Sequence, residues 1–184
     1  RAWLSLPEHF FDDAVAPNAA HDALATLERD GHLDAVLTQN VDGLHRAAGS
    51  DSVVHLHGTG STATCRDCRD VVDVTAANEV VEATDAAPTC DCGGVYKPDT
   101  VLFGERLPAE ALAAARRHAA GADLILAAGS SLTVDPAASL PAVTQREGGE
   151  IAVVNLETTR YADTATYAFR DPVEDVLPAL VDAL

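Results

Sequence analysis

The sequence predicts an α/β protein with one main domain and a small cysteine-rich insert. Short apolar runs alternate with segments of helical spacing on both sides of residues 59–97, and this alternation is typical of a parallel sheet covered by helices on both faces. Residues 59–97 show no such period and contain all four cysteines. The length of 184 residues and the hydrophobic content of 47% are sufficient for a single core. We therefore expect one parallel-sheet domain in two parts, residues 1–58 and 98–184, separated by a module at residues 59–97.

The first part of the main domain contains one predicted helix and two predicted strands. Asn18 suits the N-cap of a helix that extends to Arg29, and Gly31 is placed to end it. The apolar run 35–37 predicts a buried strand, and residues 53–57 predict a second one. Polar residues follow the first of these runs, where open α/β sheets place their ligand crevice.

The second part continues the alternation from Pro108 onward. The pattern predicts, in order, an alanine-rich helix at 108–120, a strand at 123–128, a helix near 136–146, a strand at 150–155 and a C-terminal helix. Pro172 suits the start of the last helix, whereas Pro178 lies inside it and can kink it. The near-continuous apolar strands indicate that both faces of the sheet are buried.

The four cysteines predict a zinc-binding module at residues 59–97. They form two close pairs, Cys65-x-x-Cys68 and Cys90-x-Cys92. Two such pairs suit one tetrahedral, structural Zn²⁺ per chain, and metal binding can fold a segment that is too small to fold alone. Disulfides are the alternative in an oxidising compartment, and redox catalysis by the C-x-x-C pair is another. The redox alternative lacks the strand-then-helix context that such motifs have.

A polar run, TQNVDGLH at residues 38–45, follows the first predicted strand. The side chains of Gln39, Asn40 and Asp42 offer amide and carboxylate groups that suit a carboxamide and ribose hydroxyls, and Gly43 permits a sharp turn. The alternative is a strand end with local hydrogen bonds from the Asn and Asp side chains.

The segment HLHG at residues 55–58 contains a candidate general base. His55 and His57 fall on one face of a strand because side chains alternate with period two, so the pair could also chelate a metal. No third ligand is evident nearby, and His57 precedes a glycine at the strand end. We therefore interpret His57 as a base that works near pH 7, with a structural histidine as the alternative.

Two further segments match nucleotide-binding patterns to different degrees. The run Gly58-x-Gly60-x-x-Ala63 matches a dinucleotide fingerprint by letter but leads into the first cysteine pair instead of a helix, so we reject it. The run GSSLTV at 129–134 follows a strand, and its small residues permit close approach to a phosphate or ribose. A capped helix start would look the same. Asn155 ends the next strand and is expected at the same sheet edge.

The composition is strongly acidic, with 12 Lys+Arg against 29 Asp+Glu and a formal charge of −17. Such a surface repels nucleic acids and acidic membranes, so we expect neither as a partner. Lys97 is the only lysine. This balance suits a protein from a halophile, with an ordinary acidic protein as the alternative. No apolar run is long enough to span a membrane and the N-terminus lacks signal-peptide features, which predicts a cytoplasmic protein.

Several motifs occur here in the order and approximate spacing of one family: TQNVDGLH, HLHG, the two cysteine pairs, KPDTVLFGE, GSSLTV and VNLE. Together they resemble the sirtuins, which use NAD to remove acyl groups from protein lysines. The resemblance implies a Rossmann-like domain and a zinc module with NAD and an extended acyl-lysine peptide bound between them. It also implies that the products are nicotinamide, free lysine and O-acyl-ADP-ribose.

The resemblance assigns roles to the candidate residues. His57 is implied as the base that activates the ribose hydroxyls. The nicotinamide and ribose pocket is implied to contain Gln39, Asn40 and Asp42, and the NAD phosphates and adenosine ribose are implied to contact Gly129, Ser130, Ser131 and Asn155. The peptide and the acyl-lysine stem are implied to bind Val101, Phe103, Gly104 and Glu105.

The chain departs from the family pattern near its start. The Gly-Ala-Gly-x-Ser loop and first central strand of sirtuins are not found in it, and we expect neighbouring strands to lack a partner and the phosphate-binding backbone to be incomplete. Sirtuins that prefer succinyl groups carry a Tyr-x-x-Arg pair where this chain has Trp3 and Leu6, so we expect neutral acyl groups such as acetyl. Mono-ADP-ribosyl transfer and a non-catalytic, zinc-stabilised interaction fragment are the alternative functions.

Overall fold

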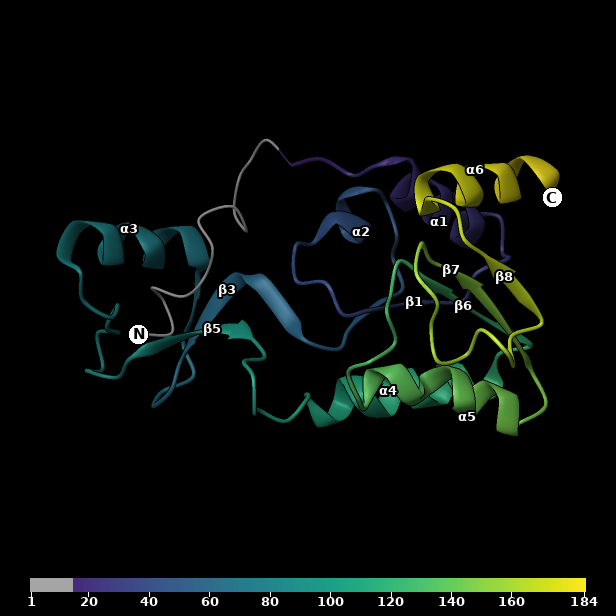
Figure 1. Ribbon diagram of the computed structural model, residues 1–184. Helices are drawn as coiled ribbons and strands as arrows, with labels where there is room; N and C mark the ends of the chain where they lie inside the picture. Colours follow the sequence, from purple (N-terminus) through teal and green to yellow (C-terminus); the bar gives the residue numbers. More distant parts are fainter. Residues whose placement is uncertain (1–14) are drawn as a thin grey trace. The chain divides into compact units, whose positions relative to one another are not determined.

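The computed structural model describes residues 15–184 and divides them into two compact units (Figure 1). One unit, called here the parallel-sheet unit, consists of Pro17–Gln39, Leu44–Leu56 and Pro108–Leu184. The other, called here the cysteine unit, contains Asn40–Gly43 and His57–Leu107. The predicted module at residues 59–97 lies within the cysteine unit. Trp3 and Leu6, on which the expected acyl preference depends, lie outside the described residues.

The strands of the parallel-sheet unit are all parallel, as predicted. One sheet pairs β1 (Val36–Thr38) with β2 (Val53–His55). The second sheet has the order β6-β7-β8, with β6 at Leu124–Ala128, β7 at Glu150–Val154 and β8 at Tyr167–Phe169. Among the described residues no strand joins the two sheets. The short strand β8 was not predicted, because its three residues are all exposed and carry no burial period.

Two helices cover one face of the second sheet. Helix α1 (Ala19–Arg29) and helix α6 (Val173–Ala183) pack together around the fully buried Leu177. Leu126 and Ala128 of β6 project from the sheet into this cluster. Successive strand residues point to opposite faces, so the alternate residues of β6, Ile125 and Ala127, point to the other face of the sheet.

The opposite face of the sheet is covered by a different set of helices. Ile125 and Ala127 of β6 pack there with the short helix η3 (Ala137–Ser139) and with α5 (Leu140–Arg146). Helix α4 (Ala109–Gly121) lies beside α5, and the buried hydroxyl of Thr144 in α5 donates a 2.7 Å hydrogen bond to the carbonyl of Ala119 in α4. The prediction of helices on both faces is confirmed.

The ends of helix α1 follow the predicted capping residues. The Asn18 side chain accepts a hydrogen bond from the backbone of His21 at 3.2 Å, and the His21 ring bonds back to the Asn18 backbone at 3.3 Å. Gly31, just after the helix, has a φ of +82°, which ends the helix at little steric cost. None of the helices within residues 15–184 has the length and apolar character that a membrane span requires.

The cysteine unit contains strands and a helix that the hydrophobic periodicity of the sequence did not predict. Strand β3 (Gly58–Cys65) pairs antiparallel with β4 (Val71–Asp73) and β5 (Tyr96–Thr100), and helix α3 (Val74–Thr84) follows β4. The residues of β3 are small or polar, so its sequence shows no alternation of hydrophobic and polar residues even though some of them are buried. The Gly58-x-Gly60-x-x-Ala63 run lies within β3 and opens no helix, which confirms that it is not a dinucleotide fingerprint.

Candidate functional site

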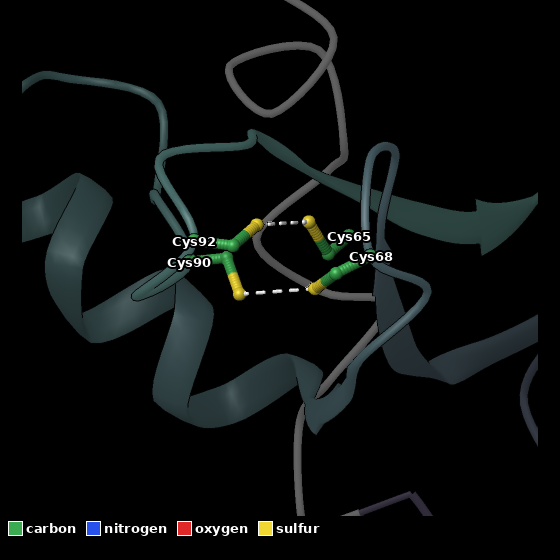
Figure 2. Close-up of side chains that lie close together, drawn as sticks. All are labelled: Cys65, Cys68, Cys90 and Cys92. Carbon is green, nitrogen blue, oxygen red and sulfur yellow. Dashed lines mark hydrogen bonds between the residues drawn. The ribbon is translucent and has the colours of Figure 1, made fainter.

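The four cysteine sulfurs of the cysteine unit lie close together (Figure 2). All four Sγ atoms are within 4.8 Å of one another, with Cys65 3.6 Å from Cys92 and Cys68 3.5 Å from Cys90. The thiols are free, so the disulfide alternative is not supported. A tetrahedral zinc with Zn–S bonds of about 2.3 Å requires sulfurs about 3.8 Å apart. The four sulfurs therefore fit one structural Zn²⁺, as predicted.

Tight backbone turns present the second pair of sulfurs. The amides of Cys90 and Gly93 form a turn by bonding to the carbonyls of Gly94 and Cys90, each at 2.8 Å. A Cβ atom placed on Gly94 would lie 2.7 Å from the sulfur of Cys65 and 2.8 Å from a carboxylate oxygen of Asp67. Glycine at position 94 therefore lets the Cys65 sulfur and the Asp67 carboxylate keep their positions.

The four thiols differ in their pKa values. The backbone amide of Cys68 is the main reason that the pKa of Cys65 falls to about 7, against an opposing effect of burial. For Cys68 the backbone amide of Asp70 lowers the pKa, but hydrogen bonds with Cys92 and Cys90 outweigh it and raise the pKa to about 12. Bound zinc would hold all four sulfurs as thiolates, and its binding would release their protons.

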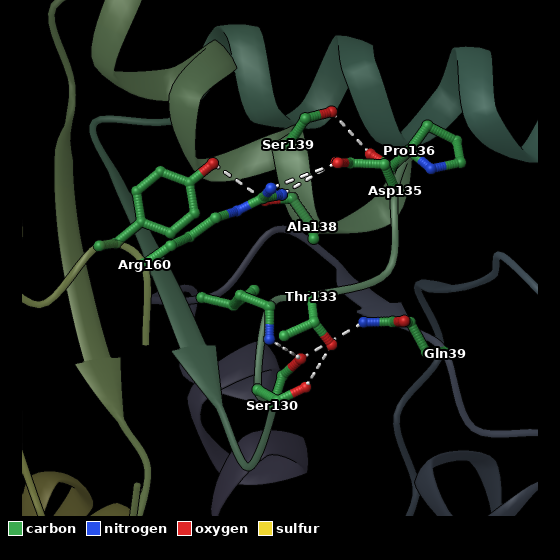
Figure 3. A network of polar contacts seen from close by, with 11 residues as sticks. Gln39, Ser130, Thr133, Asp135, Pro136, Ala138, Ser139 and Arg160 are labelled. Atoms are coloured by element: carbon green, nitrogen blue, oxygen red, sulfur yellow. Dashed lines mark hydrogen bonds and ion pairs between the residues drawn. The ribbon is translucent and has the colours of Figure 1, made fainter. Parts of the chain in front are cut away.

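In the parallel-sheet unit, the ends of two strands bring predicted cofactor-binding residues together (Figure 3). Gln39 follows β1 and Ser130 follows β6, and the Gln39 amide nitrogen lies 3.4 Å from the Ser130 hydroxyl. The same hydroxyl accepts a bond from the backbone of Leu132 at 3.3 Å. The hydroxyls of Ser131 and Thr133 are 3.0 Å apart. Small polar side chains therefore line the turn after β6, as the letters GSSLTV predicted.

Three of the predicted residues line one pocket of about 320 Å³. Gly129, Ser131 and Asn155 contribute to it from the loops after β6 and β7. The side-chain amide of Asn155 donates a hydrogen bond to the carbonyl of Glu157 at 2.9 Å. The sequence did not reveal the other side of this pocket, which includes the start of α6. Its further lining residues are Leu156, Glu157, Asp171, Pro172, Val173 and Glu174.

An ion pair joins the loop after β6 to the loop after β7 (Figure 3). The guanidinium of Arg160 donates to both oxygens of Asp135, at 2.9 and 3.2 Å, and it lies 5.5 Å from the ring centre of Tyr161. Tyr161 is buried and donates from its hydroxyl to the carbonyl of Ala138 at 2.9 Å. Hydrogen bonding to Arg160 lowers the pKa of Asp135. Sequence reasoning missed this pair because no period or motif links two loop residues so far apart.

The predicted base, His57, lies in the cysteine unit just before β3. Burial lowers its pKa, so its ring is neutral at pH 7 and can accept a proton. Among the described residues its buried Nδ1 atom has no hydrogen-bond partner. The next residue, Gly58, has a φ of +74°, and a Cβ there would collide with the carbonyl oxygen of Asp99. Glycine at position 58 therefore lets β5 approach the backbone beside His57.

His55 belongs to β2 in the parallel-sheet unit, whereas His57 lies beyond that strand. The four cysteines are the single cluster of three or more metal-ligand side chains within residues 15–184, so metal chelation by the two histidines gains no support. Asn40 and Asp42 are exposed in the loop after β1, which is tied to β3 by a 2.8 Å bond from the amide of Gly60 to the carbonyl of Val41.

The segment with the predicted peptide-binding residues follows β5. Its turn is closed by two bonds: the amide of Glu105 donates to the carbonyl of Leu102 at 2.9 Å, and the amide of Leu102 donates to the Glu105 carboxylate at 3.0 Å. Phe103 at the turn is fully exposed, with a relative accessibility of 107%. The amide of Val101 donates to the carbonyl of His57 at 2.9 Å. The structure thus joins this segment directly to the candidate base.

Comparison with known proteins gives consistent matches. The sequence profile of the Sir2 family matches residues 1–136. An NAD-dependent protein deacetylase of Haloarcula marismortui is 51% identical over 183 residues, which are 98% of this chain and 70% of that protein. An NAD-dependent protein deacetylase of Sulfolobus acidocaldarius is 45% identical over 90% of this chain. The chain spans 65% of the length of the Sulfolobus protein.

Solved structures match the fold as well. A structure described as "Sir2-p53 peptide-NAD+" has a TM-score of 0.88 and 39% sequence identity to this chain. The match covers 92% of this chain and 70% of that one.

Proposed function

The chain belongs to the Sir2 family, the sirtuins. From that premise we propose that it functions as an enzyme that uses NAD to remove acyl groups, mainly acetyl, from protein lysines. The observation that carries the proposal is the 51% identity, over 98% of the chain, to an NAD-dependent protein deacetylase. The sirtuin resemblance and the α/β fold predicted from the sequence are both confirmed.

We assign the proton transfer to His57. In the proposed reaction the acyl oxygen of the lysine substrate attacks the anomeric carbon of the nicotinamide ribose, and nicotinamide leaves with the bonding electron pair. A ribose hydroxyl must then lose its proton, and a neutral imidazole with a lowered pKa is suited to take it. Hydrolysis of the resulting intermediate completes the release of free lysine and O-acyl-ADP-ribose.

The cofactor is assigned to the residues at the strand ends. Gln39, Asn40 and Asp42 are proposed for the nicotinamide ribose, with the Gln39 amide oriented by Ser130. The pocket with Gly129, Ser131 and Asn155 is proposed for the adenosine end, because its polar groups suit ribose hydroxyls and its apolar wall suits a base. The acidic residues Glu157 and Glu174 can accept hydrogen bonds from ribose.

The acyl-lysine peptide is assigned to the segment after β5. The structure described as "Sir2-p53 peptide-NAD+" supports a peptide partner for the family fold. Phe103, Gly104 and Glu105 are exposed and Val101 is half-buried, and an extended peptide can add to the backbone of such a segment as a strand.

The setting of the enzyme is proposed from charge and from the thiols. A formal charge of −17 suits a protein that works at high salt, and the similarity to the Haloarcula marismortui protein agrees with a halophilic archaeal source. The same charge speaks against nucleic acid as a direct partner. Four clustered, unpaired thiols are typical of a reducing compartment, which supports a cytoplasmic location.

The test uses NAD labelled in its adenylate half, at high KCl, with this chain and with any longer protein that its gene encodes. Deacylation leaves the label in a small molecule and requires an acetylated peptide. Label found only on protein would instead favour mono-ADP-ribosyl transfer, and zinc-loaded protein that never cleaves NAD would favour a non-catalytic fragment.

A further inference from the structure

The only lysine of the chain, Lys97, has all three of its ammonium hydrogens accounted for. Its Nζ atom lies 3.1 Å from the carbonyl oxygen of Pro98, 2.9 Å from that of Thr100 and 3.0 Å from a carboxylate oxygen of Glu105. The side chain is 27% exposed. A partly buried ammonium with three acceptors in fixed positions is a specific contact and not a mobile surface charge.

These three acceptors lie on both sides of the proposed peptide-binding segment. Pro98 and Thr100 belong to β5, which precedes it, and Glu105 ends it. The Glu105 carboxylate also accepts the amide of Leu102 at 3.0 Å. Lys97 therefore holds the start and the end of the turn together, with Phe103 left exposed at its tip.

The same contacts reach the backbone of the proposed base. Thr100 pairs with Gly58 in the antiparallel ladder of β3 and β5, and the next amide, that of Val101, donates to the carbonyl of His57 at 2.9 Å. Fixing the carbonyl of Thr100 therefore fixes the peptide plane whose amide bonds to His57.

We propose that Lys97 is a positioning residue that holds residues 101–105 in the conformation that receives the substrate peptide and aligns the backbone of His57. The proposal rests on the proposed function. A peptide that adds to an existing backbone binds more tightly when that backbone is already ordered, because no ordering entropy is lost on binding. Lysine suits this role because its ammonium donates in three directions, whereas the planar guanidinium of arginine does not match three such acceptors.

The first experiment follows amide hydrogen exchange in the zinc-loaded full chain and needs no activity. In Lys97→Ala and Lys97→Gln the amides of Val101 and Leu102 should exchange at least about tenfold faster, because a charge-assisted contact has been removed. The control is Arg106→Ala, which removes one positive charge from an exposed residue that forms no ion pair in the described part of the chain. It should leave these amides unchanged.

The second experiment measures the affinity for acetylated peptide and for NAD separately. The Lys97 variants should weaken peptide binding by about tenfold while NAD binding changes less than about twofold. Lys97→Arg keeps the charge and the bond to Glu105, and it should recover part of the peptide affinity.

Four outcomes would overturn the proposal: unchanged exchange at residues 101–102, equal losses for peptide and NAD, no recovery in Lys97→Arg, or global unfolding of every Lys97 variant, which would give Lys97 a general structural role. If the unaltered protein bound no acylated peptide, the proposed function would fail, and the exchange experiment would still decide whether Lys97 orders the segment.

Discussion

The side chains of Gln39 and Ser130, which are 91 residues apart in the sequence, meet at 3.4 Å where β1 and β6 end. Neither strand alone forms a binding site. The contact joins the polar run after one strand to the hydroxyl-rich turn after another, at the edge where parallel sheets bind ligands. It orients an amide whose oxygen is left available for a ligand.

Loss of this contact should weaken cofactor binding. In Gln39→Ala and Ser130→Ala we expect the KM for NAD to rise by about fivefold, which corresponds to about 1 kcal/mol for one neutral hydrogen bond. Steady-state kinetics at saturating peptide measures it. Gln145→Ala, which removes the same side chain from an exposed position on α5, should leave the KM unchanged. An equal change in the KM for NAD in all three variants would show that the Gln39–Ser130 contact does not contribute specifically to NAD binding.

The pH dependence of turnover should report the lowered pKa of His57. Burial disfavours the charged ring, so the base stays neutral down to a pH below the ordinary histidine value of about 6.5. We expect kcat/KM to be constant near neutral pH and to fall as the pH drops through this lowered pKa. An acidic limb centred above about 6.5 would contradict the assignment.

Removing the ring itself is the sharper test of the base. His57→Ala should lower kcat by at least about a hundredfold, the usual contribution of a general base. His118→Ala, at an exposed position in α4, should retain full activity. Circular dichroism and zinc content should be unaltered in both variants. An active His57→Ala protein would remove this residue from its role.

The zinc site should depend on the space beside Cys65. Metal analysis should find about one Zn²⁺ per chain. Gly94→Ala places a methyl group 2.7 Å from the Cys65 sulfur, so we expect zinc to be lost at a chelator concentration that leaves the unaltered protein loaded. Gly121→Ala, where no atom lies within 4 Å of the added Cβ, should retain zinc normally. Equal zinc retention in both variants would exclude the steric role of Gly94.

The ion pair between Arg160 and Asp135 should contribute to stability in a salt-dependent way. Arg160→Ala should lower the melting temperature at low salt, and the loss should shrink as KCl rises, because both side chains are partly exposed and screened. Hydrogen bonding lowers the pKa of Asp135, so the stabilisation is complete above the ordinary aspartate pKa of about 3.9 and disappears as the pH falls through the lowered value.

Arg170 is also exposed but forms no ion pair in the part of the chain that the structure describes, so it provides the matched control for Arg160. Arg170→Ala should leave the melting temperature nearly unchanged at every salt concentration. If the two variants behaved alike, general charge repulsion and not the Asp135 contact would account for the effect.

Most of the parallel-sheet unit could be predicted from the sequence because apolar periodicity and capping residues are local signals. Asn18 and Gly31 mark the ends of α1, and the four apolar strands other than β8 stand out as continuous runs. The candidate site could be predicted in part, since Gln39 and Asn155 lie at strand ends where ligands bind.

The remainder depends on contacts that no local pattern encodes. Strand β3 consists of small and polar residues that are ordered by pairing with β4 and β5, so its sequence resembles a loop. The three acceptors of Lys97 become visible only when β5 and the following turn are folded. The side of the pocket formed by the start of α6 is brought to Gly129 by tertiary packing alone.

The central claim is tested most directly by the stoichiometry of NAD cleavage with an acetyl-lysine peptide. Mass spectrometry of the reaction, run with the zinc-loaded chain and any longer protein from its gene, should find nicotinamide, deacetylated peptide and O-acetyl-ADP-ribose in equal amounts. Nicotinamide formed without deacetylated peptide, or no nicotinamide from either protein, would contradict the claim.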